Sequence, residues 1–273
     1  MRVVVVQGSF DNLRSRHVRF LEEAAKWGSV HVALWSDETF RAQHGRPPLF
    51  PERERCYLVQ SLRFVERVTL VTGSGAPDAL ADFGAVQPDI WIVDEESDTA
   101  AKRAHAQGRG IGYRVIRNNE LSGFPVPPFV LPALDSGRKR VIVTGCYDWF
   151  HSGHVRFFEE VSALGDLYVV VGHDANIKLL KGEGHPLLPQ AERVYMVHSV
   201  RYVRQALVST GHGWMDAEPE VALIQPHLYV VNEDGDKPEK RAFCAARGIE
   251  YVTLKRIPKQ GLPRRESTAL RGF

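Results

Sequence analysis

The sequence predicts an α/β fold in which two similar domains follow one another, each with a parallel sheet and helices on both of its faces. Three observations support this prediction. Short β-branched runs alternate with amphipathic helical patterns along the chain. A stretch near the N-terminus recurs in the middle of the chain. A proline-rich segment without periodicity separates the two copies.

Composition places the chain among globular proteins of two-domain size. It has 273 residues, of which 44% are hydrophobic and 25% are charged. The net charge of +2 predicts no general field for nucleic acid or for a membrane surface. Three cysteines without C-x-x-C spacing argue against a disulfide framework and against a zinc site.

The first apolar run, MRVVVVQGSF, is too short for a signal peptide, and no segment is long enough to span a bilayer. We therefore expect a cytoplasmic protein that begins at its native start, with neither nucleic acid nor membrane as a partner.

The repeat covers most of both halves. Residues 4–28 align without gaps with residues 141–165, and residues 51–65 align with residues 189–203. In the second half we expect strands near Val141, Tyr168, Ala206, Tyr229 and Tyr251, and helices that begin near Ser152, Gln190, Ala217 and Pro238. The predicted domains are residues 1–118 and 139–273, and the connector is residues 119–138.

The connector region contains four prolines and two glycines, so we expect an extended segment. Exposing its apolar residues to water would be unfavourable. We therefore expect it to pack across a domain surface through Phe124, Val126, Phe129, Val130 and Leu131.

The chemistry is predicted at residues 141–158, VIVTGCYDWFHSGHVRFF. A strand ends at Gly145, a short turn follows, and His151 and His154 lie on one face at the start of a helix. The positive end of a helix dipole favours an anion, and Gly153 leaves room for a phosphate. The N–H groups that follow Gly145 and Cys146 can add donors.

A strand, a glycine, Asp148 and then H-x-G-H at a helix start resembles the signature of the nucleotidyltransferase superfamily, whose domains are Rossmann-like. That superfamily includes the cytidylyltransferases and the mononucleotide adenylyltransferases. The pattern D-x-x-I-x-x-x-K-G, from Asp174 through Lys181, resembles the ethanolamine-phosphate and glycerol-3-phosphate cytidylyltransferases. The former enzyme is itself a tandem duplication with one altered half.

The resemblance implies attack by a phosphate or phosphonate oxygen on the α-phosphorus of a nucleoside triphosphate. It assigns His151 and His154 to the α-phosphate and the bridging oxygen, and Lys181 to the α- and β-phosphates. Mg²⁺ would bridge the phosphates without a dedicated set of protein ligands. The remaining predicted nucleotide contacts are Gly145, Cys146, Tyr147, Asp148, Gly153, Arg201, Ser267, Thr268 and Arg271.

Three functions stay open. The first is transfer of CMP from CTP to a small phosphorylated alcohol, polyol or sugar, with release of pyrophosphate. The second uses ATP, because the tail S-T-x-L-R from Ser267 to Arg271 resembles that of the adenylyltransferases more closely. The third is a regulatory protein that binds nucleotide without turnover. The segment 232–244, with Lys237 and Lys240, is expected to border the pocket. The loops at residues 211–218 and 232–239 are expected to determine which acceptor binds.

The first half lacks parts of the motif. Arg14 and Arg16 replace the first histidine and the glycine, and His44 replaces the lysine. The C-terminal tail has no counterpart there either. We therefore predict that the first half is catalytically dead. It is expected to form an internal pseudo-dimer with the second half, in a monomer or a homodimer.

Overall fold

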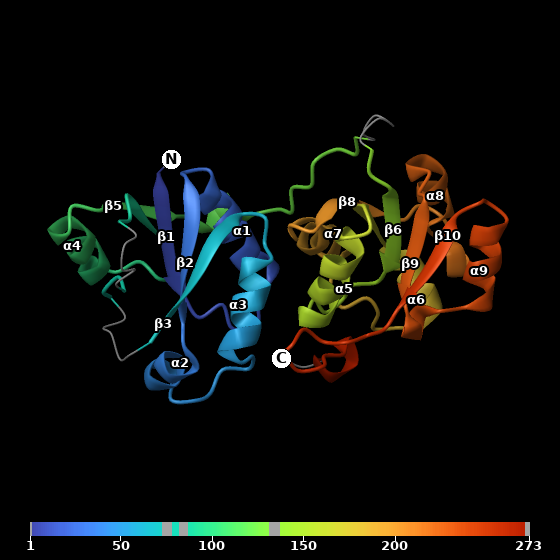
Figure 1. The fold of residues 1–273 in the computed structure, drawn as a ribbon. Helices are drawn as coiled ribbons and strands as arrows, with labels where there is room; N and C mark the ends of the chain where they lie inside the picture. The colour runs from blue at the N-terminus through green and yellow to red at the C-terminus, as the bar shows by residue number, and fades with distance from the viewer. Residues whose placement is uncertain (1, 73–77, 82–86, 131–136, 271–273) are drawn as a thin grey trace. The chain divides into compact units, whose positions relative to one another are not determined.

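The structure is a computed structural model that describes residues 2–72, 78–81, 87–130 and 137–270, without the side chains of residues 268 and 269. The chain divides into two compact units, Met1–Gly123 and Phe124–Phe273. The division falls inside the predicted connector. Each unit is described by itself (Figure 1).

The first unit is a parallel five-stranded sheet with the strand order β3-β2-β1-β4-β5. Its strands are β1 Val3–Gly8, β2 Ser29–Trp35, β3 Val65–Val71, β4 Ile90–Asp94 and β5 Gly112–Ile116. Its helices are α1 Ser15–Ala25, α2 Asp37–His44, α3 Glu52–Gln60, α4 Ala100–Gly108 and the 3-10 turn η1 Asn118–Leu121.

The second unit repeats this topology in the order β10-β9-β6-β7-β8. Its strands are β6 Arg140–Gly145, β7 Asp166–Val171, β8 Val203–Val208, β9 Leu228–Asn232 and β10 Glu250–Leu254. Its helices are α5 Ser152–Ser162, α6 Asp174–Lys181, α7 Gln190–His198, α8 Glu218–Ile224 and α9 Pro238–Ala245, with 3-10 turns η3 Gly213–Met215, η4 Glu233–Gly235 and η5 Ser267–Leu270. The predicted fold class and all five predicted strands are confirmed.

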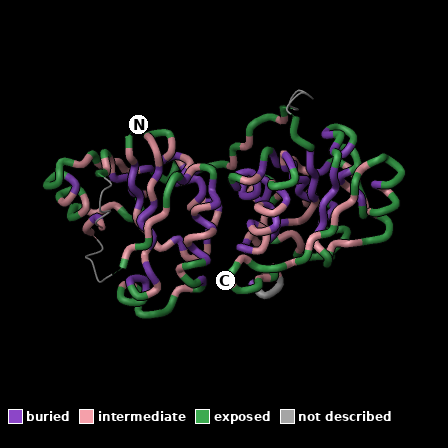
Figure 2. Tube along the Cα trace, in the orientation of Figure 1, coloured by how far each residue is buried: buried purple, intermediate pink, exposed green. Residues whose placement is uncertain are grey.

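Alternation along each strand separates two core layers. On β6, Val141 and Val143 face the cluster formed with α5 and α7, whereas Ile142 faces the cluster formed with α8 and α9. Both sets are fully buried, which explains the nearly continuous apolar runs of these strands. Figure 2 shows buried residues along the strands and on the inner sides of the helices.

One helix was not expected. No helix was predicted between those that begin near Ser152 and Gln190, but residues 174–181 form α6. The His173 side chain caps its start by accepting a hydrogen bond from the Asn176 amide, and Gly182 ends it with a φ of 86°. Capping compensates for the short length of this helix. Lys181 is therefore the last residue of a helix.

The connector packs on the second unit, as expected for most of its apolar residues. The ring centroids of Phe124 and Tyr195 are 5.9 Å apart. Val126 packs against the core layer beneath α5 and α7, and Phe129 packs against the layer beneath α8 and α9. The Gln205 side chain donates to the carbonyls of Pro127 and Pro128. Val130 differs, because 71% of it is exposed. Leu131 lies outside the described residues.

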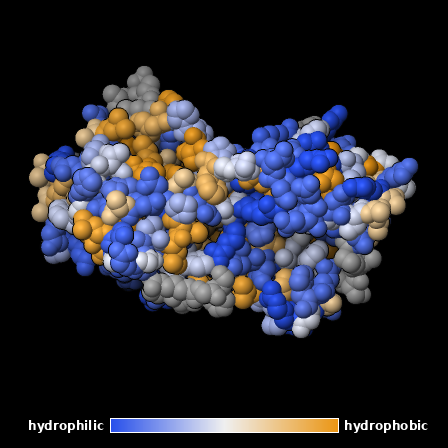
Figure 3. All heavy atoms as spheres, turned by 180° about the vertical axis from the view of Figure 1, so that it is seen from behind, coloured by the Kyte–Doolittle hydropathy of each residue, from blue (hydrophilic) through white to orange (hydrophobic). Residues whose placement is uncertain are grey.

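Surface character agrees with the mixed composition. On the face drawn in Figure 3, hydrophilic residues are interspersed with separate apolar patches. Among the described helices, none combines the length and the hydropathy that crossing a bilayer requires.

Candidate nucleotide-binding site

The turn after β6 has an unusual backbone conformation that its residues explain. Tyr147 has a φ of 55°, and its buried ring folds back over the end of the strand. A Cβ on Gly145 would lie 2.8 Å from that ring. A glycine is therefore needed at position 145 to leave room for the tyrosine ring, whether or not a ligand also approaches there. The first unit has the same turn, with Phe10 at a φ of 47°.

His151 caps α5. Its Nδ1 accepts a hydrogen bond of 3.1 Å from the Gly153 amide, so its proton resides on Nε2. Nε2 lies 3.3 Å from the Ser267 hydroxyl, which donates to the Trp149 carbonyl. His151 is fully buried. A Cβ at Gly153 would lie 2.9 Å from its ring, so this glycine makes room for the histidine.

His154 stands one turn later with its ring stacked on His151, at a centroid distance of 4.0 Å. Phe150 and Tyr147 pack against its other sides. Its Nδ1 is buried and has no hydrogen-bond partner among the described residues. Because buried polar atoms are normally paired, His154 is the ring that remains available for a ligand.

Both imidazoles are neutral at physiological pH. Burial lowers the pKa of His151 to about 3, and Arg256 and Arg265 add to this effect. Burial also lowers the pKa of His154 well below its ordinary value, with further contributions from His151, Arg256 and Lys181. Each ring can therefore donate or accept a hydrogen bond without adding a charge to the site.

Acid should destabilise the second unit through His151. The unfolded chain takes up a proton near the ordinary pKa of 6.5, whereas folded His151 stays neutral down to about pH 3. The stability present above pH 6.5 is therefore lost as pH falls. Between pH 8 and pH 5 the free energy of unfolding should decrease by about 2 kcal/mol through this group. Urea unfolding at both pH values measures it.

The matched variant for this measurement is His151→Asn. Asparagine can still accept the hydrogen bond from the helix start but does not titrate in this range. Between pH 8 and pH 5 the free energy of unfolding should therefore decrease by about 2 kcal/mol less in the variant than in the wild-type chain. An identical pH dependence in both proteins would show that His151 is not held neutral by the fold.

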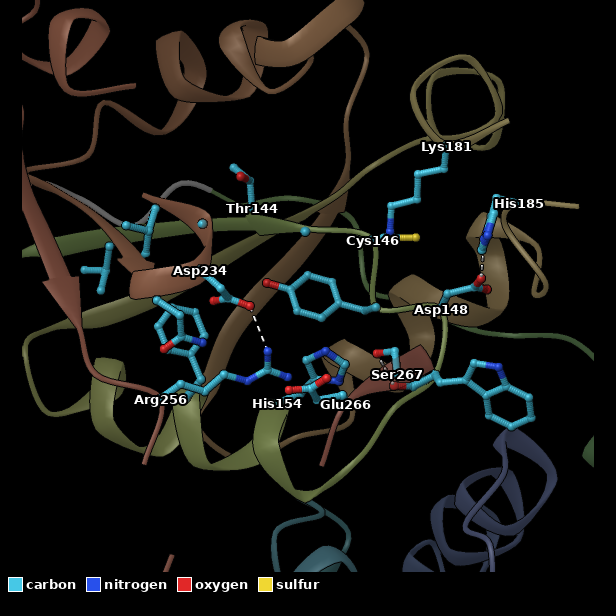
Figure 4. A pocket seen from close by; sticks show the side chains of 18 of the residues that line it. Thr144, Cys146, Asp148, His154, Lys181, His185, Asp234, Arg256, Glu266 and Ser267 are labelled. Carbon is cyan, nitrogen blue, oxygen red and sulfur yellow. Dashed lines mark hydrogen bonds and ion pairs between the residues drawn. The ribbon is translucent and has the colours of Figure 1, made fainter. Parts of the chain in front are cut away.

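A pocket of about 610 Å³ opens at the carboxyl ends of β6 and β9. Ligands bind at this edge in sheets of this topology. Figure 4 shows His154 and Arg256 next to one another, with Lys181 entering from another side. The described lining residues are Thr144, Gly145, Cys146, Tyr147, Asp148, Trp149, His154, Phe157, Lys181, His185, Val230, Val231, Asn232, Asp234, Gly235, Lys240, Arg256, Arg264, Glu266 and Ser267.

Asp148 anchors the segment that follows α6. Its carboxylate accepts hydrogen bonds of 2.8 and 2.9 Å from the amides of Leu187 and Leu188, and it lies 3.6 Å from Nδ1 of His185. Lys181 stands just before this segment at the pocket wall. It has no carboxylate partner within the part of the chain that the structure describes. Its ammonium is therefore available for phosphate.

Arg256 is the main residue that sequence reasoning missed. It follows β10 and forms an ion pair of 2.7 Å with Asp234, and its guanidinium also donates to the Arg265 carbonyl (Figure 4). It thus fixes the C-terminal tail against the pocket. Its position directly after a parallel strand was the available signal, since such strands end at the ligand-binding edge. His185, Arg264 and Glu266 were missed as well.

Several predicted residues lie in the pocket and others do not. Ser267 lines the pocket. In the segment 232–244, which was expected to border the pocket, Lys240 lines it but Lys237 does not. His151 and Gly153 are not among the pocket's described lining residues, although His151 stacks on His154, which is. Arg201 requires a correction. It is exposed and precedes β8, so it lies at the opposite edge of the parallel sheet from the pocket.

Two residues of the predicted triphosphate site are not placed. Arg271 and the side chain of Thr268 lie outside the described residues, so their assignment stays a prediction. Among the residues that are described, no group of three histidines, cysteines or carboxylates is arranged for a metal ion. In the pocket, Asp148 already binds amides and Asp234 already pairs with Arg256.

A parallel α/β domain whose first turn carries a capping histidine and a second histidine that lines the pocket defines the HxGH class of nucleotidyltransferases. Comparison with known proteins agrees. Residues 142–215 match the family model described as Cytidylyltransferase-like. The chain belongs to this cytidylyltransferase-like family of the nucleotidyltransferase superfamily.

Two relatives illustrate the match. The chain is 36% identical to the FAD synthase of Aciduliprofundum boonei over 45% of its own length and 80% of that protein. It is 32% identical to the Bifunctional protein HldE of Methylococcus capsulatus over 45% of its own length, but covers only 26% of that longer protein. A solved lipopolysaccharide core biosynthesis protein from Thermoplasma volcanium aligns with 48% of this chain and all of its own, at 23% identity and a TM-score of 0.37.

Proposed function

We propose that the second unit transfers a nucleoside monophosphate from a nucleoside triphosphate, in the first place CTP, to a small phosphorylated alcohol, polyol or sugar. One observation carries this proposal. The neutral imidazole of His154, whose buried Nδ1 has no hydrogen-bond partner among the described residues, lines the same pocket as Lys181, for which those residues provide no carboxylate partner. Family membership supports the reaction class.

In the proposed reaction a phosphate oxygen of the acceptor forms a bond to the α-phosphorus. The bond from that phosphorus to the bridging oxygen breaks, and pyrophosphate leaves with the electron pair. The imidazole of His154 donates a hydrogen bond to the α-phosphate, and Lys181 balances the charge on the leaving group. His151 acts as a positioning residue, because it fixes the start of α5 and holds Ser267.

Mg²⁺ is proposed to enter with the triphosphate. It prefers oxygen ligands and often retains several waters, so it does not need a protein cage. The described lining residues suit that arrangement, since Asp234 and Glu266 border the pocket without forming a closed set. When bound, the ion would neutralise negative charge on the phosphate oxygens.

ATP is the second candidate for the nucleotide. The tail from Ser267 resembles the adenylyltransferases, and relatives named FAD synthase make a product that contains an adenine nucleotide. The α6 segment instead resembles the cytidylyltransferases. Lys240, whose pKa burial lowers, is proposed to contact the acceptor together with the segment that begins at Asn232.

The test is pyrophosphate release with Mg²⁺ and each of the four nucleoside triphosphates. Each would be combined with a panel of phosphorylated alcohols, polyols, sugars and mononucleotides. Release with CTP supports the first candidate, and preference for ATP supports the second. Tight triphosphate binding without release for any acceptor would favour a regulatory protein and would contradict the proposed reaction.

A further inference from the structure

The first unit contains a pocket of its own. Its volume is about 190 Å³, and it lies at the carboxyl ends of β1 and β4, at the position that corresponds to the pocket of the second unit. The described residues that line it are Gln7, Gly8, Ser9, Phe10, His17, Phe20, Trp35, Trp91, Val93, Asp94, Ser97 and Lys102. This is the edge where ligands bind in such sheets.

The scaffold around this pocket repeats several hydrogen bonds of the second unit. The Asp11 carboxylate accepts from the amides of Leu49 and Phe50, as Asp148 does from its two leucines. Buried Arg55 donates to the Ser9 carbonyl and to Asp37, as Arg193 does to Cys146 and Asp174. The pocket wall is therefore built as firmly as that of the nucleotide site.

The residues that replace the predicted phosphate contacts of the second unit, in contrast, already interact with other residues of the chain. Arg16 replaces the glycine at the helix start, and its guanidinium lies 2.8 Å from Glu96 and 2.5 Å from the Asn118 side chain. His44 replaces the pocket lysine and stacks on Phe40 at a centroid distance of 4.2 Å. Arg16 is thus already paired with a carboxylate, and Lys102, the lysine that lines this pocket, donates to the Ser97 carbonyl. Because both cations already have partners, this pocket favours phosphate less than the pocket of the second unit does.

The lining is rich in aromatic side chains. Trp35 stands where the second unit has Gly172. Phe10, Phe20 and Trp91 are aromatic in both units, since Tyr147, Phe157 and Tyr229 stand at the matching positions. Large aromatic rings favour planar ligands, because stacking adds to the burial of apolar area. At about 190 Å³ the pocket is smaller than those that hold drug-sized molecules.

Polar groups stand between these rings. The Nδ1 atom of His17 accepts from the Arg14 amide, so its Nε2 carries a hydrogen and is a donor. Trp91 is 1% exposed, and its indole N–H has no partner among the described residues. Asp94 replaces Asn232, and only its Oδ1 accepts from the Ser97 amide. Two donors and a carboxylate oxygen are the kinds of group that can form hydrogen bonds with the edge of a nucleobase.

We propose that the pocket of the first unit binds an uncharged planar heteroaromatic ring, a free nucleobase or its nucleoside, and discriminates against the phosphorylated forms. The rings of Trp35 and Trp91 border the ligand, and Asp94 accepts a hydrogen bond from its N–H edge. This site is separate from the proposed transferase site and does not depend on the reaction assigned to that site.

The test follows the indole N–H resonances of the five tryptophans of the full chain, assigned with Trp35→Phe and Trp91→Phe. The probes are adenine, guanine, cytosine and uracil, their nucleosides, and ATP and CTP. At least one base or nucleoside should shift the signals of Trp35 and Trp91 and saturate below about 1 mM, the affinity expected of a small ligand. ATP or CTP should instead shift Trp149, which lines the other pocket.

Two variants separate this site from the transferase site. Asp94→Asn, which introduces the residue that the second unit carries, should weaken binding of the base about tenfold or more. Lys181→Ala should leave the response of Trp35 and Trp91 unchanged. The proposal is overturned if no probe shifts these two signals, if Asp94→Asn has no effect on the affinity, or if nucleotides shift them as strongly as nucleosides.

Discussion

Replacing His154 with alanine should lower kcat/KM for pyrophosphate release by at least about a hundredfold, the usual loss when one preorganised donor to a transition-state oxyanion is removed. The structure gives two reasons to expect an effect of this size. The ring is held on three sides by Tyr147, Phe150 and His151, so it is oriented before substrate binds. It is also neutral, so its hydrogen bond needs no prior proton transfer.

The matched control is His17→Ala in the first unit. His17 occupies the equivalent helix position, and burial lowers its pKa as well. There, however, Arg14 and Arg16 replace the capping histidine and the glycine. Pyrophosphate release should therefore change by less than about twofold, whereas the proposed base binding of the first unit should weaken. Equal losses of turnover in the two variants would show that the two units do not differ in activity as proposed.

Replacing Arg193 with methionine should destabilise the second unit by about 3 kcal/mol or more. The side chain is buried, and it donates to the carbonyls of Leu188, Cys146 and Gly172 and to Asp174. Methionine fills much of the same space but leaves those buried acceptors without a donor. Since these acceptors belong to the turn after β6, to the end of β7 and to the segment beside the pocket, transferase activity should fall as well.

Amide hydrogen exchange measured by mass spectrometry can locate this effect. Peptides from residues 140–172 should lose protection more than a hundredfold in Arg193→Met, because about 1.4 kcal/mol corresponds to tenfold. Arg55→Met should produce the same loss only in peptides of the first unit. Arg156→Met removes a partly exposed arginine that pairs with Glu159 and Glu160, so its effect should stay within about 1 kcal/mol. Similar losses for Arg156 and Arg193 would contradict this account.

Much of the candidate site could be predicted because it is local in sequence. The strand, the turn and the helix start that carry Gly145, Asp148 and His154 are contiguous, so their order predicts their geometry. The role of His151 could not be predicted in the same way. Its Nε2 meets Ser267, which lies 116 positions away, and only the folded tail makes the histidine a buried positioning residue.

Residues joined across long separations were missed or misplaced for the same reason. Arg256 reaches Asp234 across 22 positions, because β9 and β10 are neighbours in the sheet. Arg201 has the residue type expected of a phosphate ligand, but it precedes β8 and so lies at the wrong edge. Residue type alone does not reveal the edge of a sheet at which a side chain lies.

The sequence by itself determined the class of fold, the tandem repeat and the family, because these follow from hydrophobic periodicity and from a contiguous motif. Tertiary structure decided which of the two histidines lines the pocket and that Arg256 and Arg264 line it as well. It also decided that the first unit retains a pocket at the same edge of its sheet, and that Arg16 forms an ion pair with Glu96. These features depend on side chains that the parallel sheets bring together from distant positions, and no local pattern encodes that proximity.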